Sequence, residues 1–194
     1  MKIGLVSDTH GDRQAWRAAL AGPFARADWV LHAGDLLYHG PRNPMPAGYD
    51  PAGLAADLNE APCPLVIARG NCDADVDQLA IEWPIQAPYG LLALPGLTIL
   101  VTHGDTLTEE EMVHLGSRYG AALVVHGHTH LPSIKDCGEV MLVNPGSPAL
   151  PKAAAGVEPR RTVAVIEDAH LTIVDLDDGS VVARDGLPWR PARP

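Results

Sequence analysis

The chain has 194 residues, 46% hydrophobic and 20% charged, a composition typical of one soluble globular domain. Its formal net charge of -10 argues against binding to long polyanions or to an anionic membrane surface. Its three cysteines show neither a disulfide framework nor a zinc-ligand spacing. A membrane span needs roughly 18 consecutive apolar residues, and no apolar run in the chain approaches that length. The cysteine pattern and the short apolar runs together predict a cytoplasmic protein.

The first part of the chain alternates predicted strands with predicted helices. Short apolar runs predict strands at 2–7, 28–33 and 64–68, and amphipathic stretches between them predict helices at 14–20 and 51–59. Residues 36–49 are rich in proline and glycine and are expected to form a long surface loop. Strands that alternate with helices indicate a parallel α/β arrangement.

The rest of the chain is dominated by predicted strands. They are expected at 91–94, 98–102, 123–125, 140–143, 162–167, 171–175 and 180–183. One helix is predicted among them, at 109–117. We therefore expect an α/β fold in which two sheets pack face to face with helices outside. Residues 1–188 are predicted to form a single domain, and the proline-rich residues 189–194 are expected to fray.

Oxygen and imidazole side chains follow the apolar runs in five places. These are Asp8-Thr9-His10, Gly34-Asp35, Gly70-Asn71-Cys72-Asp73, His103-Gly104 and Gly127-His128-Thr129-His130. Side chains that follow parallel strands gather at one edge of a sheet. Mixed oxygen and nitrogen ligands suit Mn²⁺, Fe²⁺, Zn²⁺ or Ni²⁺, and two such ions held together hydrolyse phosphate esters.

Each motif alone also has an ordinary structural explanation. Gly34-Asp35 is compatible with a helix cap or turn, and Asn71 after Gly70 with a plain turn. Gly127-His128-Thr129-His130 is more specific, because two histidines two residues apart rarely serve packing alone. The occurrence of all five motifs in order, each after an apolar run, favours the metal-site interpretation.

Together these motifs resemble the calcineurin-like metallophosphoesterase superfamily, whose pattern is D-x-H, G-D, G-N-[HCD]-D, H-G and G-H-x-H. Within it, the chain is most similar to the small bacterial YfcE-type phosphodiesterases. That closer similarity rests on His39-Gly40-Pro41-Arg42-Asn43, on the residues around Asn71 and Cys72, and on Asn144-Pro145-Gly146-Ser147. The resemblance implies a four-layer αββα sandwich of two mixed β-sheets flanked by helices.

The resemblance also implies the site. One ion would bind Asp8, His10, Asp35 and His130, and the other would bind Asp35, Asn71, His103 and His128. Mn²⁺ is the expected metal, with Zn²⁺, Fe²⁺ and Ni²⁺ as alternatives. The expected activity is hydrolysis of small phosphodiesters by a metal-bound hydroxide, with Asp35, Asn71 and Cys72 as catalytic residues.

Two residues have alternative roles. Cys72 stands where many superfamily members carry a histidine that protonates the leaving group or holds the phosphate. A thiol with a pKa of about 8.5 is a poor proton donor, so Cys72 is either a weak catalytic group that contacts the substrate or only a small structural residue. Arg42 either contacts the substrate phosphate or is a solvated loop charge.

Three functions are open at this point. A small-molecule phosphodiesterase is favoured, and a phosphomonoesterase or cyclic-nucleotide phosphodiesterase would use the same centre. A non-catalytic scaffold is disfavoured because every expected ligand position holds a competent residue. We expect no long nucleic-acid substrate and no membrane partner, and the oligomeric state, monomer or homo-oligomer, is open.

Overall fold

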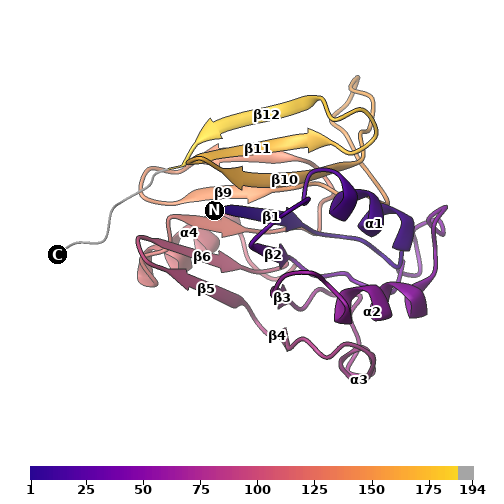
Figure 1. Ribbon diagram of the computed structural model, residues 1–194. Coiled ribbons are helices and arrows are strands. Elements are labelled where there is room, and N and C mark those ends of the chain that lie inside the picture. The colour runs from indigo at the N-terminus through magenta and orange to yellow at the C-terminus, as the bar shows by residue number, and fades with distance from the viewer. Residues whose placement is uncertain (188–194) are drawn as a thin grey trace.

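Two mixed β-sheets form the centre of the computed structural model, which describes residues 1–187 (Figure 1). The larger sheet has the order β12-β11-β10-β1-β2-β3-β4. Its strands are β1 (Lys2–Val6), β2 (Trp29–His32), β3 (Leu65–Ala68), β4 (Ile85–Gln86), β10 (Thr162–Glu167), β11 (His170–Asp175) and β12 (Val181–Gly186). The smaller sheet has the order β5-β6-β7-β9-β8. Its strands are β5 (Gly90–Leu94), β6 (Leu97–Val101), β7 (Leu123–Val125), β8 (Ser133–Asp136) and β9 (Met141–Asn144).

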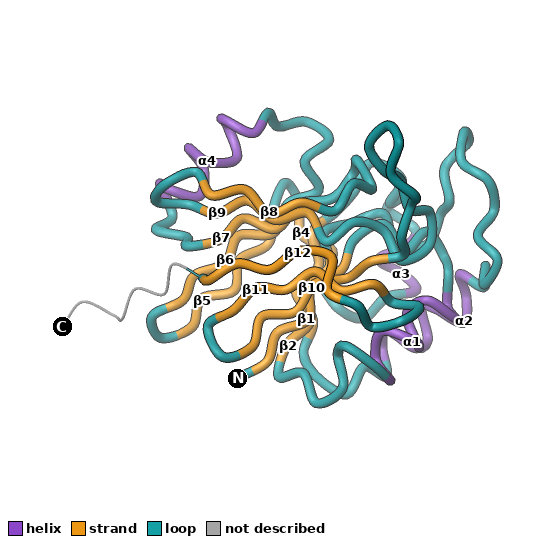
Figure 2. The backbone as a smooth tube through the Cα atoms, turned by 90° about the horizontal axis from the view of Figure 1, so that it is seen from above, coloured by secondary structure: helices purple, strands orange, loops and turns teal. Residues whose placement is uncertain are grey.

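Helices cover the outer faces of both sheets (Figure 2). Helices α1 (Arg13–Ala21) and α2 (Pro51–Asn59) pack Trp16 and Leu54 against Val30 of the larger sheet. Helix α4 (Glu109–Arg118) packs Met112 against the smaller sheet, and α3 (Asp77–Ala80) is a single turn. This arrangement confirms the predicted four-layer αββα sandwich. None of the helices within residues 1–187 is long and apolar enough to cross a membrane.

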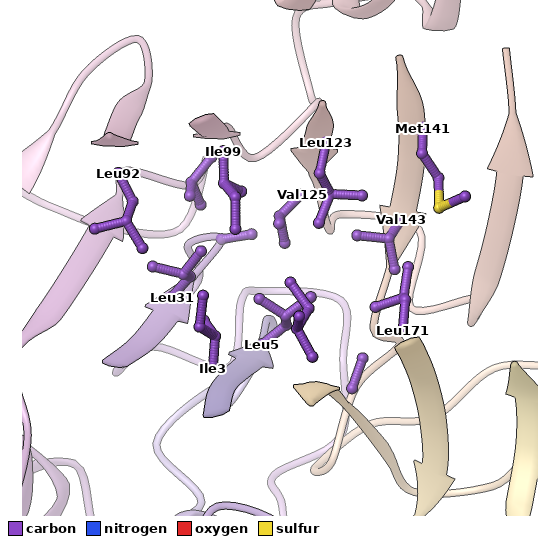
Figure 3. Packing of buried hydrophobic residues seen from close by; sticks show 14 of the residues in the cluster. Ile3, Leu5, Leu31, Leu92, Ile99, Leu123, Val125, Met141, Val143 and Leu171 are labelled. Atoms are coloured by element: carbon purple, nitrogen blue, oxygen red, sulfur yellow. The ribbon is translucent and has the colours of Figure 1, made fainter. Parts of the chain in front are cut away.

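The main core lies between the two sheets (Figure 3). Alternation along each strand sends every second side chain into this layer. Ile3, Leu5 and Leu31 of the larger sheet face Ile99 and Val125 of the smaller one, and all five are fully buried. Each such side chain contributes about 1.5–3 kcal/mol of burial energy, so this layer provides a rigid platform for the loops at the strand ends.

The two sheets do not correspond to the two halves of the chain. Strands β10, β11 and β12 return to the first sheet, where β10 pairs antiparallel with β1 through Leu5 and Ala164. Three short elements, α3, β4 and β8, were not predicted. They have four, two and four residues, too few to give a clear periodicity. The predicted tail, 189–194, lies outside the described residues.

Candidate metal centre

The predicted ligands come together at the carboxyl ends of the parallel strands. β1, β2 and β3 are parallel neighbours in one sheet, and β6 and β7 are parallel neighbours in the other. Backbone hydrogen bonds join the loops that follow these strands, from Asp8 N to Gly34 O at 3.0 Å and from Gly127 N to His103 O at 3.0 Å. A side chain at Gly127 would collide with Ser7 and Asp8, so this close approach requires glycine.

The backbone at most of these ligands is left-handed. The φ angles are 56° at Asp8, 46° at His10, 58° at Asp35, 67° at His128 and 60° at His130. Positive φ is uncommon for residues other than glycine, although aspartate and histidine tolerate it better than most. It turns each of these side chains away from the course of its strand toward a common centre.

Asp8, His10 and His130 form the first group of donors, with ligand atoms within 4.8 Å of one another. The Nδ1 atoms of His10 and His130 lie 2.7 Å from Tyr38 O and 2.6 Å from Leu150 O. Because a carbonyl oxygen only accepts, each Nδ1 must donate. In the neutral imidazoles the Nε2 atoms then carry lone pairs, and these two atoms are 3.2 Å apart.

Asp8 completes this group with a carboxylate oxygen that lacks a hydrogen-bond partner. Oδ2 accepts from the backbone N–H of His128 at 3.1 Å. Oδ1 is fully buried without a hydrogen bond and lies 3.3 Å from His130 Nε2. A buried, unpartnered carboxylate oxygen is costly unless a cation compensates it. The donor set therefore fits a divalent ion bound between these three side chains.

The two carboxylate oxygens of Asp35 face different donors. Oδ1 is 3.4 Å from His103 Nε2, whereas Oδ2 is 3.7 Å from His10 Nε2. The Cys72 N–H donates to Oδ1 at 2.8 Å and fixes the carboxylate plane. Burial is the largest single influence and would raise the pKa of Asp35, but His103, the Cys72 N–H and His10 together lower it. Asp35 therefore lies between two clusters of ligands.

Asn71 and two histidines form the second group. Asn71 Oδ1 lies 3.1 Å from His103 Nε2 and 2.8 Å from His128 Nδ1. His103 Nδ1 donates to Ala33 O at 2.7 Å, which leaves Nε2 directed at Asn71 and Asp35. Burial is the largest single influence and lowers the pKa of His103, but the contact with Asp35, the charge of Asp8 and the hydrogen bond to Ala33 together raise it to about 9. The carboxylates thus favour a positive charge here, which a divalent ion would supply.

Asp73 supports the second group, and no role for it was assigned from the sequence. Its carboxylate accepts from the backbone N–H groups of Asp35 at 2.9 Å, Leu36 at 2.7 Å and Gly70 at 2.7 Å. Burial raises the pKa of Asp73 to about 6, against the lowering effect of the Gly70 N–H. The only sequence signal was its place at the end of the Gly70-Asn71-Cys72-Asp73 motif.

His32 supports the first loop from behind. Thr9 Oγ1 donates to Leu36 O at 2.9 Å, so His32 Nε2, 2.9 Å away, must donate to Thr9 Oγ1. His32 Nδ1 then accepts from Gly34 N at 3.1 Å. Burial lowers the pKa of His32 to about 4, so the ring is neutral, as this hydrogen bonding requires. These contacts make His32 a structural support of the loop rather than one of the ligands.

Asn144 and Ser147 connect the two loops that carry Asp8 and His128. Asn144 Nδ2 donates to Gly127 O at 2.8 Å and to Thr129 Oγ1 at 3.0 Å. Ser147 Oγ donates to Asp8 O at 2.7 Å. Both residues belong to one short segment, Asn144-Pro145-Gly146-Ser147. The hydrogen bonds tie it to both ligand-bearing loops.

Cys72 lies close to the loop that carries Arg42, and the two side chains differ in exposure. Cys72 Sγ belongs to a group with ligand atoms of His10 and Asp35. Burial, and then the charge of Asp35, raise the pKa of its thiol to about 12. The loop that carries Arg42 reaches Cys72, because a Cβ built on Gly40 would lie 3.3 Å from Cys72 Sγ. Arg42 itself is exposed on this loop.

Comparisons with known proteins also indicate a phosphoesterase. Residues 1–169 match the model of the calcineurin-like phosphoesterase superfamily domain. The chain is 37% identical to phosphodiesterase YfcE of Escherichia coli over 186 residues, which cover 95% of this chain and 97% of the relative. The solved structure of that phosphoesterase has a TM-score of 0.83 at 34% identity, covering 96% of this chain and 100% of the other. Vps29 of Entamoeba histolytica in complex with zinc has a TM-score of 0.63 at 21% identity, covering 96% of this chain and 99% of the other, which shows a common fold alone.

Proposed function

The chain belongs to the calcineurin-like phosphoesterase superfamily, and on this premise we propose that it is a metal-dependent hydrolase of small phosphodiesters. The observation that carries the proposal is the orientation of Asp35, whose two oxygens face two separate groups of donors. Asp8, His10 and His130 with one oxygen of Asp35 would hold one ion. Asn71, His103 and His128 with the other oxygen would hold the second.

The metal is proposed to be Mn²⁺, with Zn²⁺, Fe²⁺ or Ni²⁺ as alternatives. Carboxylate, amide and imidazole donors suit these ions. When bound, two divalent ions would lower the pKa of a water molecule and neutralise charge on the phosphate oxygens. His10 and His130 donate from Nδ1 to backbone carbonyls, which leaves their Nε2 lone pairs free to hold an ion, and Asp73 holds the loop of Asp35 in place.

The substrate side of the centre is proposed to lie near Cys72 and Arg42. The Cys72 thiol lies near ligand atoms of His10 and Asp35 but is a poor proton donor at neutral pH. The chain would therefore favour diesters with stable leaving groups. Arg42, on the loop over Cys72, would contact a phosphate oxygen of the bound diester.

The net charge of the chain supports a small substrate, and its free cysteines support a reducing compartment. With a net charge of -10, a long DNA or RNA chain would be repelled outside the centre. Cys63, Cys72 and Cys137 are all free thiols, consistent with a cytoplasmic protein. We further propose that residues 1–188 act as a single unit, because strands from both ends of the chain share one sheet.

The test is an assay of the purified protein with Mn²⁺, Zn²⁺, Fe²⁺ or Ni²⁺ against diesters, monoesters, cyclic nucleotides and a long oligonucleotide. We expect turnover of small diesters to exceed that of the other classes. Asp136→Asn is a matched control for Asp35→Asn, since Asp136 is exposed on β8 and the amide oxygen can still accept from Gly138 N. Faster turnover of monoesters or of the oligonucleotide, or equal activity in both variants, would refute the proposal.

A further inference from the structure

Four exposed apolar side chains converge on one groove at the side of the sandwich. The groove has a volume of about 470 Å³, and three segments far apart in the chain supply these side chains: Leu131 before β8, Val157 between β9 and β10, and Val181 and Val182 at the start of β12. Their exposed fractions are 38%, 61%, 59% and 37%. Single exposed apolar residues are common, but a group of them lining one groove indicates a contact with another molecule.

The groove lies where both sheets end. β12 is the last strand of the larger sheet and β8 the last of the smaller one, and the two strands contact each other (Figure 2). Within residues 1–187, no further strand pairs with the outer edge of either. The groove also adjoins the candidate metal centre, because Leu131 directly follows His130 and Lys152 N donates to His130 O at 3.3 Å. A molecule bound in the groove would therefore contact the segment that carries a candidate metal ligand.

The charged residues of the groove have opposite signs. Arg160 is already engaged within the chain, at 3.6 Å from Asp175 and 3.2 Å from Ser180 Oγ. Lys152 and Glu158 also line the groove, and neither side chain has an ion pair with another residue of the described part of the chain. In a two-fold symmetric contact, residue i of each copy meets residue j of the other. A face with one free ammonium group and one free carboxylate beside an apolar centre is therefore complementary in charge to a second copy of itself.

We propose that this groove is the interface of a symmetric homodimer. The valines of the two copies would pack together, and Lys152 of each copy would face the partner's Glu158. A small apolar ligand would leave both charges without a partner, and a strongly acidic or basic protein would meet one like charge. The long-range repulsion between two copies with a net charge of -10 is largely screened at physiological salt.

The first test is sedimentation velocity of the full chain over a dilution series from about 100 µM to about 1 µM. The monomer mass is 20.5 kDa, and we expect at least twice this mass at the higher concentration. Val157→Asp and Val182→Asp each place a charge in the groove and should raise the Kd at least about ten-fold. Leu79→Asp is the matched control, because Leu79 is 86% exposed on α3 and receives the same charge outside the groove. A monomeric wild type, or an oligomer whose Kd neither groove variant raises, would overturn the proposal.

An exchange of charges tests whether the partner is a second copy. Lys152→Glu gives a copy with two carboxylates in the groove, and Glu158→Lys gives a copy with two ammonium groups. Each variant alone should dimerise about five-fold more weakly than the wild type. An equimolar mixture of the two should associate again, because every charge pair across the two-fold axis is then attractive. A mixture that associates no more strongly than either variant alone would overturn the proposal, and neither experiment depends on phosphodiesterase activity.

Discussion

The Nε2 atoms of His10 and His130 face each other at a distance of 3.2 Å. Since each Nδ1 is engaged with a backbone carbonyl, the facing atoms are two acceptors with no proton between neutral rings. A cation that accepts both lone pairs removes this repulsion. The same pair therefore links metal binding to the stability of the fold.

Removal of metal is accordingly expected to abolish activity and to lower the melting temperature. Any ion that binds only the folded state stabilises it, by about 2.7 kcal/mol when its concentration is 100 times its dissociation constant. The measurement is thermal unfolding of chelator-treated protein with and without added Mn²⁺, together with diester turnover. Full turnover by protein verified to be metal-free would contradict the prediction.

Asp35→Asn is expected to lose more metal than Asp8→Asn. Asp35 has one oxygen near each donor group, whereas Asp8 Oδ1 lies nearest to His130 and His10, at 3.3 and 3.8 Å from their Nε2 atoms. Elemental analysis after dialysis should show loss of both ions in Asp35→Asn and retention of about one in Asp8→Asn. Asp136→Asn should keep the wild-type content. A larger loss in Asp8→Asn would mean that Asp35 does not bridge two ions.

Cys72→Ala is expected to leave hydrolysis of an activated diester within a few-fold of wild type. A nitrophenolate hardly needs a proton as it leaves, whereas an alkoxide needs one. Cys72→His, which restores the residue common in the superfamily, should increase activity on poorly activated esters more than on activated ones. The measurement is kcat/KM for the three proteins on a leaving-group series. Loss of activity in Cys72→Ala with both metals retained would show that the thiol takes part in the chemistry.

Much of the fold followed from local patterns, but the support of the site did not. Strands β1 and β3 were predicted to within one residue, because a short apolar run before a polar group marks where a buried strand ends. The contact of Ser147 with Asp8 joins residues 139 apart in the chain, so no local pattern indicates it. The role of Asp73 likewise depends on backbone N–H groups of the Asp35 loop, which only tertiary packing brings within reach.

Asp57→Asn is expected to destabilise the fold without affecting the metal centre. Asp57 accepts hydrogen bonds from Arg13 and Arg17, which connect α1 to α2. The hydrogen bonds from Arg13, followed by those from Arg17, hold the pKa of Asp57 well below its usual range. Loss of this network should lower the free energy of unfolding by about 1 kcal/mol at pH 7.

The pH dependence gives this prediction a second measurement. Because the folded-state pKa is depressed, the stabilisation is present above the unfolded-state value of about 3.9 and disappears as the pH falls toward the folded-state value. Urea unfolding of wild type and Asp57→Asn should therefore converge in acid. A difference between the two proteins that grows below pH 4 would show that the arginine contacts are not its source.

The left-handed backbone at Asp8, His10, Asp35, His128 and His130 has an evolutionary consequence. Each such residue costs roughly 1–2 kcal/mol relative to an ordinary conformation, and glycine would avoid most of that cost. Selection for catalysis must therefore act continuously against a gain in stability at these positions. A lineage that abandoned the chemistry would be expected to drift toward glycine or asparagine at these positions.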